Sequence, residues 1–221
     1  SKCNKKISLS EPFKNLFTQG MVCHESYKDL NGNWLYPEEV QKIDGQNFIK
    51  KIDKTKVIVG PAESMSKSKK NTIDPEEMIK NYGADSVRLF ILSDSPPEKD
   101  VQWSEEGISS AYKFLQKLWN LNSKVHQEIN KAHKKDNDDK IEQYTNRIVK
   151  KITDNLENFH YNIIIANLHT MYSFLFKEIE NGYTKETILR NYVKILILMN
   201  PILPHFSSEC LRLLEKNNNI V

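Results

Sequence analysis

Three lysines and two serines stand close together in residues 65–71, Met-Ser-Lys-Ser-Lys-Lys-Asn, which we call the lysine loop. Lysine ammonium groups act as point charges on phosphate oxygens, and hydroxyl and backbone N–H groups add hydrogen bonds. A loop of this composition therefore suits the binding of a polyphosphate. Composition alone also fits a plain solvated surface loop, because most charge runs are solvated.

The elements on either side of the lysine loop are expected to hold it in place. An apolar strand is predicted over residues 57–59, ending at Gly60-Pro61. After the loop, Asp74 is suited to cap a helix that has Pro75 at its first position, and Gly83 is suited to end that helix. The sequence thus predicts a basic loop between two rigid elements.

The composition is that of a globular protein with one large domain or two to three small ones. The chain has 221 residues, of which 38% are hydrophobic and 28% charged, with a net charge of +3. Its longest apolar runs are too short to span a bilayer, so no membrane partner is expected. Cys3, Cys23 and Cys210 are isolated, which favours a reducing compartment and a cytoplasmic protein. Up to Thr72, thirteen lysines stand against eight acids, a basic excess that permits RNA contact.

The first part of the chain is predicted to hold one short helix and a strand. Phe13, Leu16 and Phe17 have the spacing of one helix face, and residues 19–23 are a strand candidate.

A small β-rich insertion of about thirty residues is predicted next, too small to build a core of its own. Asn31-Gly32 and Asp44-Gly45 each indicate a two-residue hairpin turn. Cys23-His24 has no second pair at zinc-ligand spacing, so no metal site is expected there.

From residue 84 onward the sequence predicts helices. One is expected over residues 84–92, ended by Pro96-Pro97, and the next begins at Ser104 as its N-cap. Residues 133–140 are expected to form a charged linker. Further amphipathic helices are expected over residues 141–159, 162–181, 185–200 and 204–216. Short connections between them imply a bundle, and the predicted fold class is α+β, predominantly α.

The order of residues in the lysine loop resembles a known signature. Residues 65–68 resemble the second signature of the class I aminoacyl-tRNA synthetases, Lys-Met-Ser-Lys-Ser, although Ser64 stands where its first lysine should be. Residues 11–22, Glu-Pro-Phe-Lys-Asn-Leu-Phe-Thr-Gln-Gly-Met-Val, resemble the bacterial leucyl-tRNA synthetase family in particular. Residues 69–71 argue against the valine and isoleucine enzymes, which more often have Leu-Gly-Asn at this place.

This resemblance implies four parts of the chain. They are the end segment of a Rossmann-like catalytic domain (1–22), a small β-rich leucine-specific insertion (23–56), the signature loop with a stem-contact connector (57–104), and a helical bundle of the anticodon-binding type (105–221).

The resemblance also implies an activity. In this family ATP, with Mg²⁺, activates leucine to leucyl-adenylate, and the leucyl group then passes to tRNA-Leu. Carried over to the matching positions, Lys67 is the catalytic residue, because a cation there stabilises charge on the departing pyrophosphate. The implied ATP-binding residues are Met65, Ser66, Lys67, Ser68 and Lys69. No metal is expected to be held by this chain.

Contacts with tRNA are expected at Arg88, Trp34 and Lys70. Arg88 is expected to reach a phosphate or, alternatively, to form a structural salt bridge, while Trp34 stacks on a base or packs within its hairpin. The lysine loop is expected to close over ATP, with Gly60 and Pro61 setting one end of the moving segment. The bundle is expected to hold the tRNA body through shape and phosphates, with an affinity that falls as salt rises.

Two parts that the resemblance leads us to expect do not occur in the sequence. These are the His-x-Gly-His signature of the nucleotide fold and the editing insertion. We therefore interpret the chain as an internal-to-C-terminal piece of a longer ligase, and expect no leucine activation from it alone. The alternatives are a non-catalytic tRNA-binding or structural module and a valyl or isoleucyl enzyme fragment. A pure binding module has no need of this loop beside a capped helix.

Overall fold

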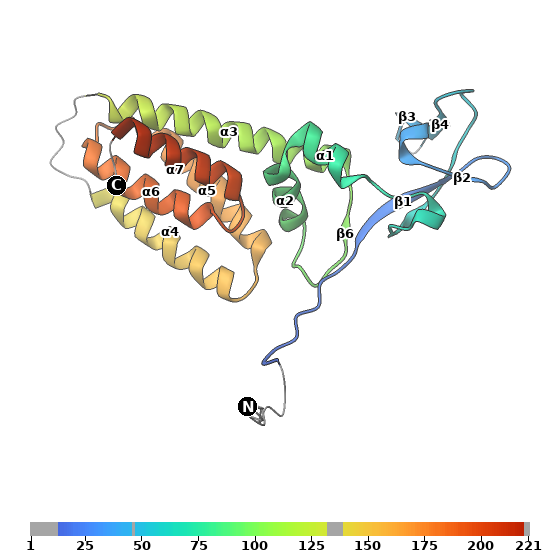
Figure 1. Ribbon diagram of the computed structural model, residues 1–221, viewed down its shortest axis with the longest axis horizontal. Coiled ribbons are helices and arrows are strands. Elements are labelled where there is room, and N and C mark those ends of the chain that lie inside the picture. Colours follow the sequence, from blue (N-terminus) through green and yellow to red (C-terminus); the bar gives the residue numbers. More distant parts are fainter. Residues whose placement is uncertain (1–12, 46, 132–138, 219–221) are drawn as a thin grey trace, which may run out of the picture.

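The computed structural model describes residues 13–45, 47–131 and 139–218. A helical body lies at one end of the molecule and a small β region at the other, with helices α1 (Pro75–Tyr82) and α2 (Ala84–Ser93) between them (Figure 1). The predicted α+β class with mostly helix is confirmed. In the described part of the chain, no helix is long and apolar enough to cross a membrane.

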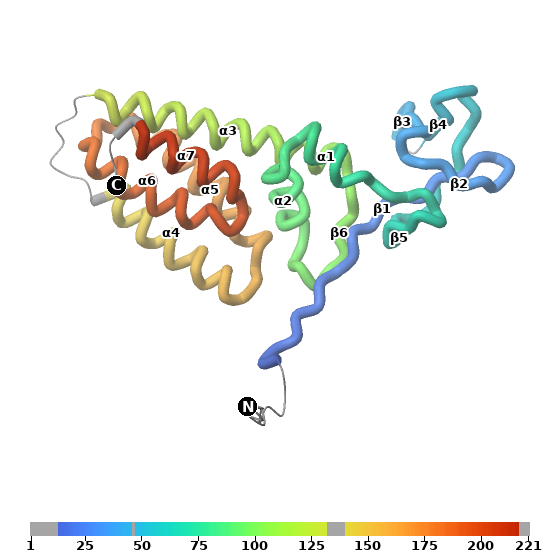
Figure 2. The backbone as a smooth tube through the Cα atoms, in the orientation of Figure 1, coloured from blue at the N-terminus to red at the C-terminus, as the bar shows by residue number. Residues whose placement is uncertain are grey.

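Strand β1 (Val22–Lys28) is the centre of the main sheet. It pairs antiparallel with β5 (Ile58–Ser64) and with β2 (Trp34–Leu35), and its first residues pair in parallel with β6 (Val101–Gln102). Figure 2 shows the chain from the N-terminal side entering β1 close to β6. The sheet therefore joins segments that are far apart in the sequence, and β5 leads directly into the lysine loop.

Strand β5 does not end at Gly60-Pro61, as the sequence predicted. It continues to Ser64, and the register of β1 shifts around Ser26, opposite Gly60-Pro61. Such a bulge accommodates a proline within a sheet and is a common place for glycine. A Cβ atom on Gly60 would lie 2.5 Å from the Ser26 Oγ, so a larger residue here would have to displace that buried hydroxyl. The two residues expected to set one end of the loop's closing motion thus lie within a strand that is paired on both sides of them.

The segment before β1 is extended rather than helical, so the helix predicted around Phe13 and Leu16 is wrong. These two side chains are 81% and 89% exposed, so the apolar face that they would form on a helix has no surface to pack against. Phe17 stacks on Phe159 with ring centroids 4.6 Å apart. The Gly20 N–H donates to the Pro97 carbonyl at 2.8 Å, so a distant loop takes the backbone bond that a helix would need.

A second, two-stranded sheet lies within residues 23–56, for which the sequence predicted a β-rich insertion. It consists of β3 (Val40–Asp44) and β4 (Asn47–Lys50), and Gly45 lies in the turn between them with a φ of 40°. With β2 and the residues between, we call residues 34–50 the β module. Its small core contains Tyr27, Leu35, Val40 and Val57, two of them from outside the module. The module therefore depends on the main sheet for its packing.

The hairpin predicted at Asn31-Gly32 forms, although its loop is longer than two residues. The pair Lys28 and Trp34 closes it, and the Gly32 N–H donates to the Asp29 carbonyl at 3.1 Å. Gly32 has a φ of 87°, a left-handed conformation that glycine adopts at no steric cost.

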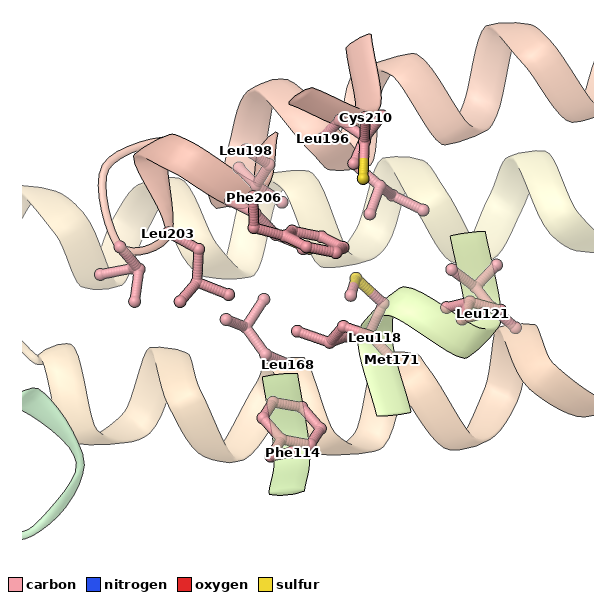
Figure 3. Packing of buried hydrophobic residues seen from close by; sticks show 14 of the residues in the cluster. Phe114, Leu118, Leu121, Leu168, Met171, Leu196, Leu198, Leu203, Phe206 and Cys210 are labelled. Atoms are coloured by element: carbon pink, nitrogen blue, oxygen red, sulfur yellow. The ribbon is translucent and has the colours of Figure 1, made fainter. Parts of the chain in front are cut away.

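Within the described residues, five helices form the bundle. They are α3 (Glu105–Ile129), α4 (Asp139–Glu157), α5 (Tyr161–Glu178), α6 (Lys185–Met199) and α7 (Pro204–Asn218). Figure 3 shows Phe114, Leu118, Leu168, Met171 and Phe206 meeting at their common core. The charged linker predicted over residues 133–140 falls mostly outside the described residues, and its last two belong to α4.

The predicted helix caps are confirmed where a side chain was expected to make them. An Asp74 carboxylate oxygen accepts the Glu76 N–H at the start of α1, and the Ser104 hydroxyl accepts the Gly107 N–H at the start of α3. Gly83 ends α1 as predicted, but its φ of 82° and ψ of 151° lie outside the left-handed helical region expected of it and in one that glycine reaches without steric cost. These local bonds fix the direction in which α1 leaves the lysine loop.

Candidate functional site

The lysine loop connects the end of β5 to α1. It contains a single 3₁₀ turn over Lys67–Lys69, and Lys70 follows in the left-handed conformation with a φ of 54°. A non-glycine residue in this conformation is uncommon, and it reverses the chain so that the loop closes on itself. Met65 packs against the hydrophobic core that the bundle shares with α1 and α2, while Lys67 and Ser68 are exposed. The loop is thus anchored on one side and open to solvent on the other.

The three lysines of the loop have different surroundings. Lys69 forms an ion pair with Glu63 on β5. Lys70 places its ammonium group 5.0 Å from the centre of the Tyr36 ring in the β module. Among the described residues, the Lys67 ammonium group has neither a hydrogen-bond nor an ion-pair partner, so its charge is available to a ligand.

The electrostatics of the loop follow from these pairings. The hydrogen bond from Lys69 holds the pKa of Glu63 below its usual value, so this carboxylate stays charged at neutral pH and keeps Lys69 beside it. The hydroxyls of Ser66 and Ser68 lie 2.7 Å apart and share a hydrogen bond. Both are close in sequence to Lys67, and a hydroxyl pair beside a free ammonium group suits an anion with several oxygens.

Sequence reasoning missed the residue that holds the loop together. Asn71 is fully buried, and its amide hydrogen-bonds to the backbone of β1, of β5 and of the loop itself. The sequence pattern gave it no structural role, since asparagine at the end of a polar run is usually read as a turn residue. Ser64, which replaces the first signature lysine, ends β5 in register with Cys23 and is exposed.

The residues predicted to contact tRNA do not lie together. The ammonium group of Lys28 lies 4.0 Å from the centre of the Trp34 ring, at the edge of the β module. Lys70 and Tyr36 form a similar pair on the loop side of that module. Arg88 lies elsewhere, on α2, where its partners belong to the bundle.

Arg88 joins α2 to the turn between α6 and α7. Its guanidinium group donates to the Pro201 carbonyl at 2.7 Å and to the Ile202 carbonyl at 3.2 Å. Arg88 therefore has a structural role, but its partners are carbonyl oxygens and not the acid of the expected salt bridge. Its contact with a tRNA phosphate stays a prediction. Nearby, the buried Asp85 carboxylate accepts the Phe206 N–H at 2.7 Å.

The largest hollow that we find lies at this junction and not at the lysine loop. It has a volume of about 710 Å³ and opens between α2, α3 and α7. Tyr112, Trp119 and Phe206 give it an aromatic lining, and none of the described residues that line it is a lysine or arginine. A hollow lined without lysine or arginine is poorly suited to phosphate. In the described chain, no group of three His, Cys, Asp or Glu side chains could hold a metal ion.

Comparison with known proteins agrees with the position of the lysine loop. Residues 57–104 match the tRNA synthetases class I (I, L, M and V), and residues 138–221 match the anticodon-binding domain of tRNA ligase. The leucine–tRNA ligase of Rickettsia typhi is 43% identical over 208 residues, which are 92% of this chain. The chain belongs to the leucyl-tRNA synthetase family. Zymomonas mobilis leucine–tRNA ligase is 38% identical over 96% of the chain. The chain spans about a quarter of the length of these relatives, 24% in each case.

Solved synthetase structures share the fold. A leucyl-tRNA synthetase of Agrobacterium radiobacter K84, in a ternary complex with tRNA and LeuAMS, gives a TM-score of 0.66 at 21% identity, covering 93% of this chain and 23% of that one. Methionyl-tRNA synthetase of Mycobacterium tuberculosis with methionyl-adenylate gives 0.55 at 18% identity, covering 68% and 35%. The arrangement of sheet, α1–α2 and bundle is therefore a synthetase arrangement.

Proposed function

We propose that this chain supplies the ATP-phosphate loop and tRNA-docking surfaces for the ligation of leucine to tRNA-Leu. The observation that carries the proposal is the exposed and unpartnered Lys67 at the tip of an anchored loop, within the described residues. Its two neighbouring lysines are engaged, one with Glu63 and the other with Tyr36. One cation is therefore free where the resemblance expects a cation on the phosphates.

The proposed chemistry explains why one free cation matters. The leucine carboxylate attacks the α-phosphate of ATP, and the bond to pyrophosphate breaks, so negative charge grows on the leaving group. An ammonium group that meets this charge more closely in the transition state than in the ground state raises the rate. Lys67 has this role in the proposal, and the hydroxyls of Ser66 and Ser68 donate to the same oxygens. Magnesium would arrive as the complex with ATP.

Movement of the loop is restricted to a short segment. Because β5 is paired as far as Ser64 and Asn71 is buried, closure over ATP would bend the chain between these two residues. Lys69 would leave Glu63 only if the ligand offered a stronger partner. Lys67 would need no such exchange, and we assign it the main phosphate contact for this reason.

The proposed tRNA contacts are on the β module. In the pairs Lys28–Trp34 and Lys70–Tyr36, an aromatic ring lies beside an ammonium group. Such a pair can stack on an unpaired base and neutralise the adjoining phosphate. A tRNA contact is less well supported for Arg88, because its guanidinium group already donates its hydrogen bonds to carbonyl groups of the bundle.

A chimeric ligase tests the catalytic part of the proposal. The chain replaces the corresponding segment of the Rickettsia typhi ligase, and leucine-dependent ATP–pyrophosphate exchange is measured. We expect exchange with leucine rather than valine or isoleucine, and a loss of about 10²-fold in kcat/KM for Lys67→Ala. Lys80→Ala, which removes an exposed lysine on α1, is the matched control and should leave the rate unchanged. An inactive chimera, or near-normal exchange in Lys67→Ala, would contradict the proposal.

The 221-residue chain by itself tests the docking part. We expect it to give no exchange, and to bind leucine tRNA with an affinity that falls steeply with salt. A parallel titration with a non-cognate tRNA measures preference. Equal binding of the two would mean that this chain does not discriminate between them, and exchange by the chain alone would overturn our interpretation of it as part of a catalytic unit. The cytoplasmic location stays a prediction.

A further inference from the structure

Asn71 is the most completely enclosed polar side chain of the lysine loop, and its contacts converge from three segments. Its Oδ1 accepts the Ser66 N–H at 2.8 Å. Its Nδ2 faces the carbonyls of His24 at 3.2 Å, Glu63 at 3.3 Å and Ser64 at 3.5 Å. The side chain is fully buried. One amide therefore links β1, the end of β5 and Ser66 within the loop.

The chemistry of these partners fixes the orientation of the amide. A backbone N–H only donates and a carbonyl only accepts, so the oxygen must face Ser66 and the nitrogen must face the carbonyls. An aspartate of nearly the same shape keeps the acceptor but loses both donors. Its carboxylate would then lie against carbonyl oxygens in a site closed to water, where an unsatisfied or repelled charge is strongly disfavoured.

These contacts also fix the backbone segment that carries the Lys67 side chain. The bond between Ser66 and Asn71 closes residues 66–71 into a ring, and the left-handed Lys70 turns the chain so that Asn71 can enter the interior. The other side-chain contacts of the loop, Lys69 with Glu63, Lys70 with Tyr36 and Ser66 with Ser68, are partly or largely exposed, and exposed polar contacts contribute little. Asn71 is thus the main constraint on where the Lys67 ammonium group can be.

We propose that Asn71 is a positioning residue, which holds the lysine loop as a closed ring and so places Lys67 for the phosphates of ATP. The part that concerns ATP rests on the proposed function. The part that concerns the loop does not, because it follows from hydrogen bonds within this chain. The two parts can be tested separately.

The first test uses the 221-residue chain without any ligand. Trypsin cleavage after Lys67, located by mass spectrometry, and hydrogen exchange of the Ser66 amide report whether the ring is closed. We expect Asn71→Asp to speed both by about tenfold or more, because local opening exposes the peptide and the amide together. Asn81→Asp, with the same change of charge on the exposed face of α1, should match the parent. Thermal unfolding shows whether the rest of the fold persists.

Asn71→Ala is the second variant of this test, because it removes donors and acceptor without adding a charge. We expect it to open the ring as well, but to a smaller extent than aspartate. Cleavage and exchange at the parental rate in both variants would overturn the proposal. If Asn71→Asp fails to fold, Asn71→Ala decides the question.

The second test is a double-mutant cycle in the active chimera. If Asn71 acts by placing Lys67, Asn71→Asp should lower kcat by about tenfold or more alone, and by much less when Lys67 is already alanine. A merely structural role would lower the amount of active enzyme equally in both backgrounds. If the losses in kcat of the two single variants multiply in full in the double variant, Asn71 does not act through Lys67, and this part of the proposal is overturned. A chimera without any exchange would refute the proposed function, and the ring would still be decided by the first test.

Discussion

The junction between α2 and α7 yields a prediction whose size follows from the structure. The Asp85 carboxylate is buried, with its side chain 4% exposed. It accepts the Phe206 N–H at 2.7 Å and bonds the His205 Nδ1 at 2.9 Å, and the His205 N–H is further away at 3.4 Å. Asp85 therefore caps the start of α7 from another helix, and it connects the bundle to the elements that follow the lysine loop.

The expected cost of removing this carboxylate is the sum of its two short bonds. A hydrogen bond to a charged group contributes about 1.5 kcal/mol or more, so Asp85→Ala should destabilise the chain by about 3 kcal/mol. For a chain of this length, each kcal/mol lowers Tm by about 2–4 °C, which gives a fall of about 6–12 °C. Asp85→Asn should cost less, because its oxygen still caps the helix and only the charge is lost.

Thermal unfolding of the 221-residue chain at neutral pH, followed by circular dichroism, measures this change. Asp154→Ala, on the exposed face of α4, removes a carboxylate that has no such role and should leave Tm nearly unchanged. A fall in Tm of less than about 2 °C for Asp85→Ala would refute the reasoning, because it would mean that the cap contributes under 1 kcal/mol. Calorimetry shows whether the sheet and the bundle unfold together.

Two further predictions concern other parts of the chain. Burial works to raise the pKa of Glu178, but hydrogen bonds led by that of Lys140 outweigh it and lower the pKa from 4.5 to about 2. The folded state thus gains stability from this carboxylate above pH 4.5 and loses it as the pH falls towards 2. The difference in Tm between the parent and Glu178→Gln should shrink over that window, and a constant difference would contradict the assignment. In the sheet, Gly60→Ala should cost about 1–3 kcal/mol, because the new methyl group meets the Ser26 Oγ. Ser26→Ala should relieve part of that cost in the double variant, and full additivity in thermal unfolding would exclude the clash.

Much of the helical part was predictable from local sequence. The caps at Asp74 and Ser104 and the glycine at position 83 act through bonds to residues a few positions away. The bundle helices lie within a few residues of their predicted bounds, because each carries an apolar stripe that specifies one buried face. For these elements, the information needed to form them is contained in a short stretch of chain.

The same kind of reasoning failed for the segment around Phe13 and at Gly60-Pro61. A helical spacing of apolar residues has no effect when no partner surface covers it, and the backbone of Gly20 bonds to Pro97 instead. Gly60-Pro61 usually signals the end of a strand, but here the two residues form a bulge in β5 opposite the single residue Ser26 of β1. In each case the deciding contact comes from a distant part of the chain.

For the candidate site, the sequence by itself determined which residues bring the charge. The order of lysines and serines in the loop, and the cap at Asp74, identified the loop and its likeness to class I synthetases. Only the tertiary structure decided which lysine is free, because Lys69 and Lys70 are engaged by Glu63 and Tyr36 from other elements. It also gave Asn71 its place as the anchor, since a buried amide is defined by the backbone groups that the folded chain brings around it. Local sequence selects chemical groups, whereas their partners and their freedom depend on contacts between segments that only folding brings together.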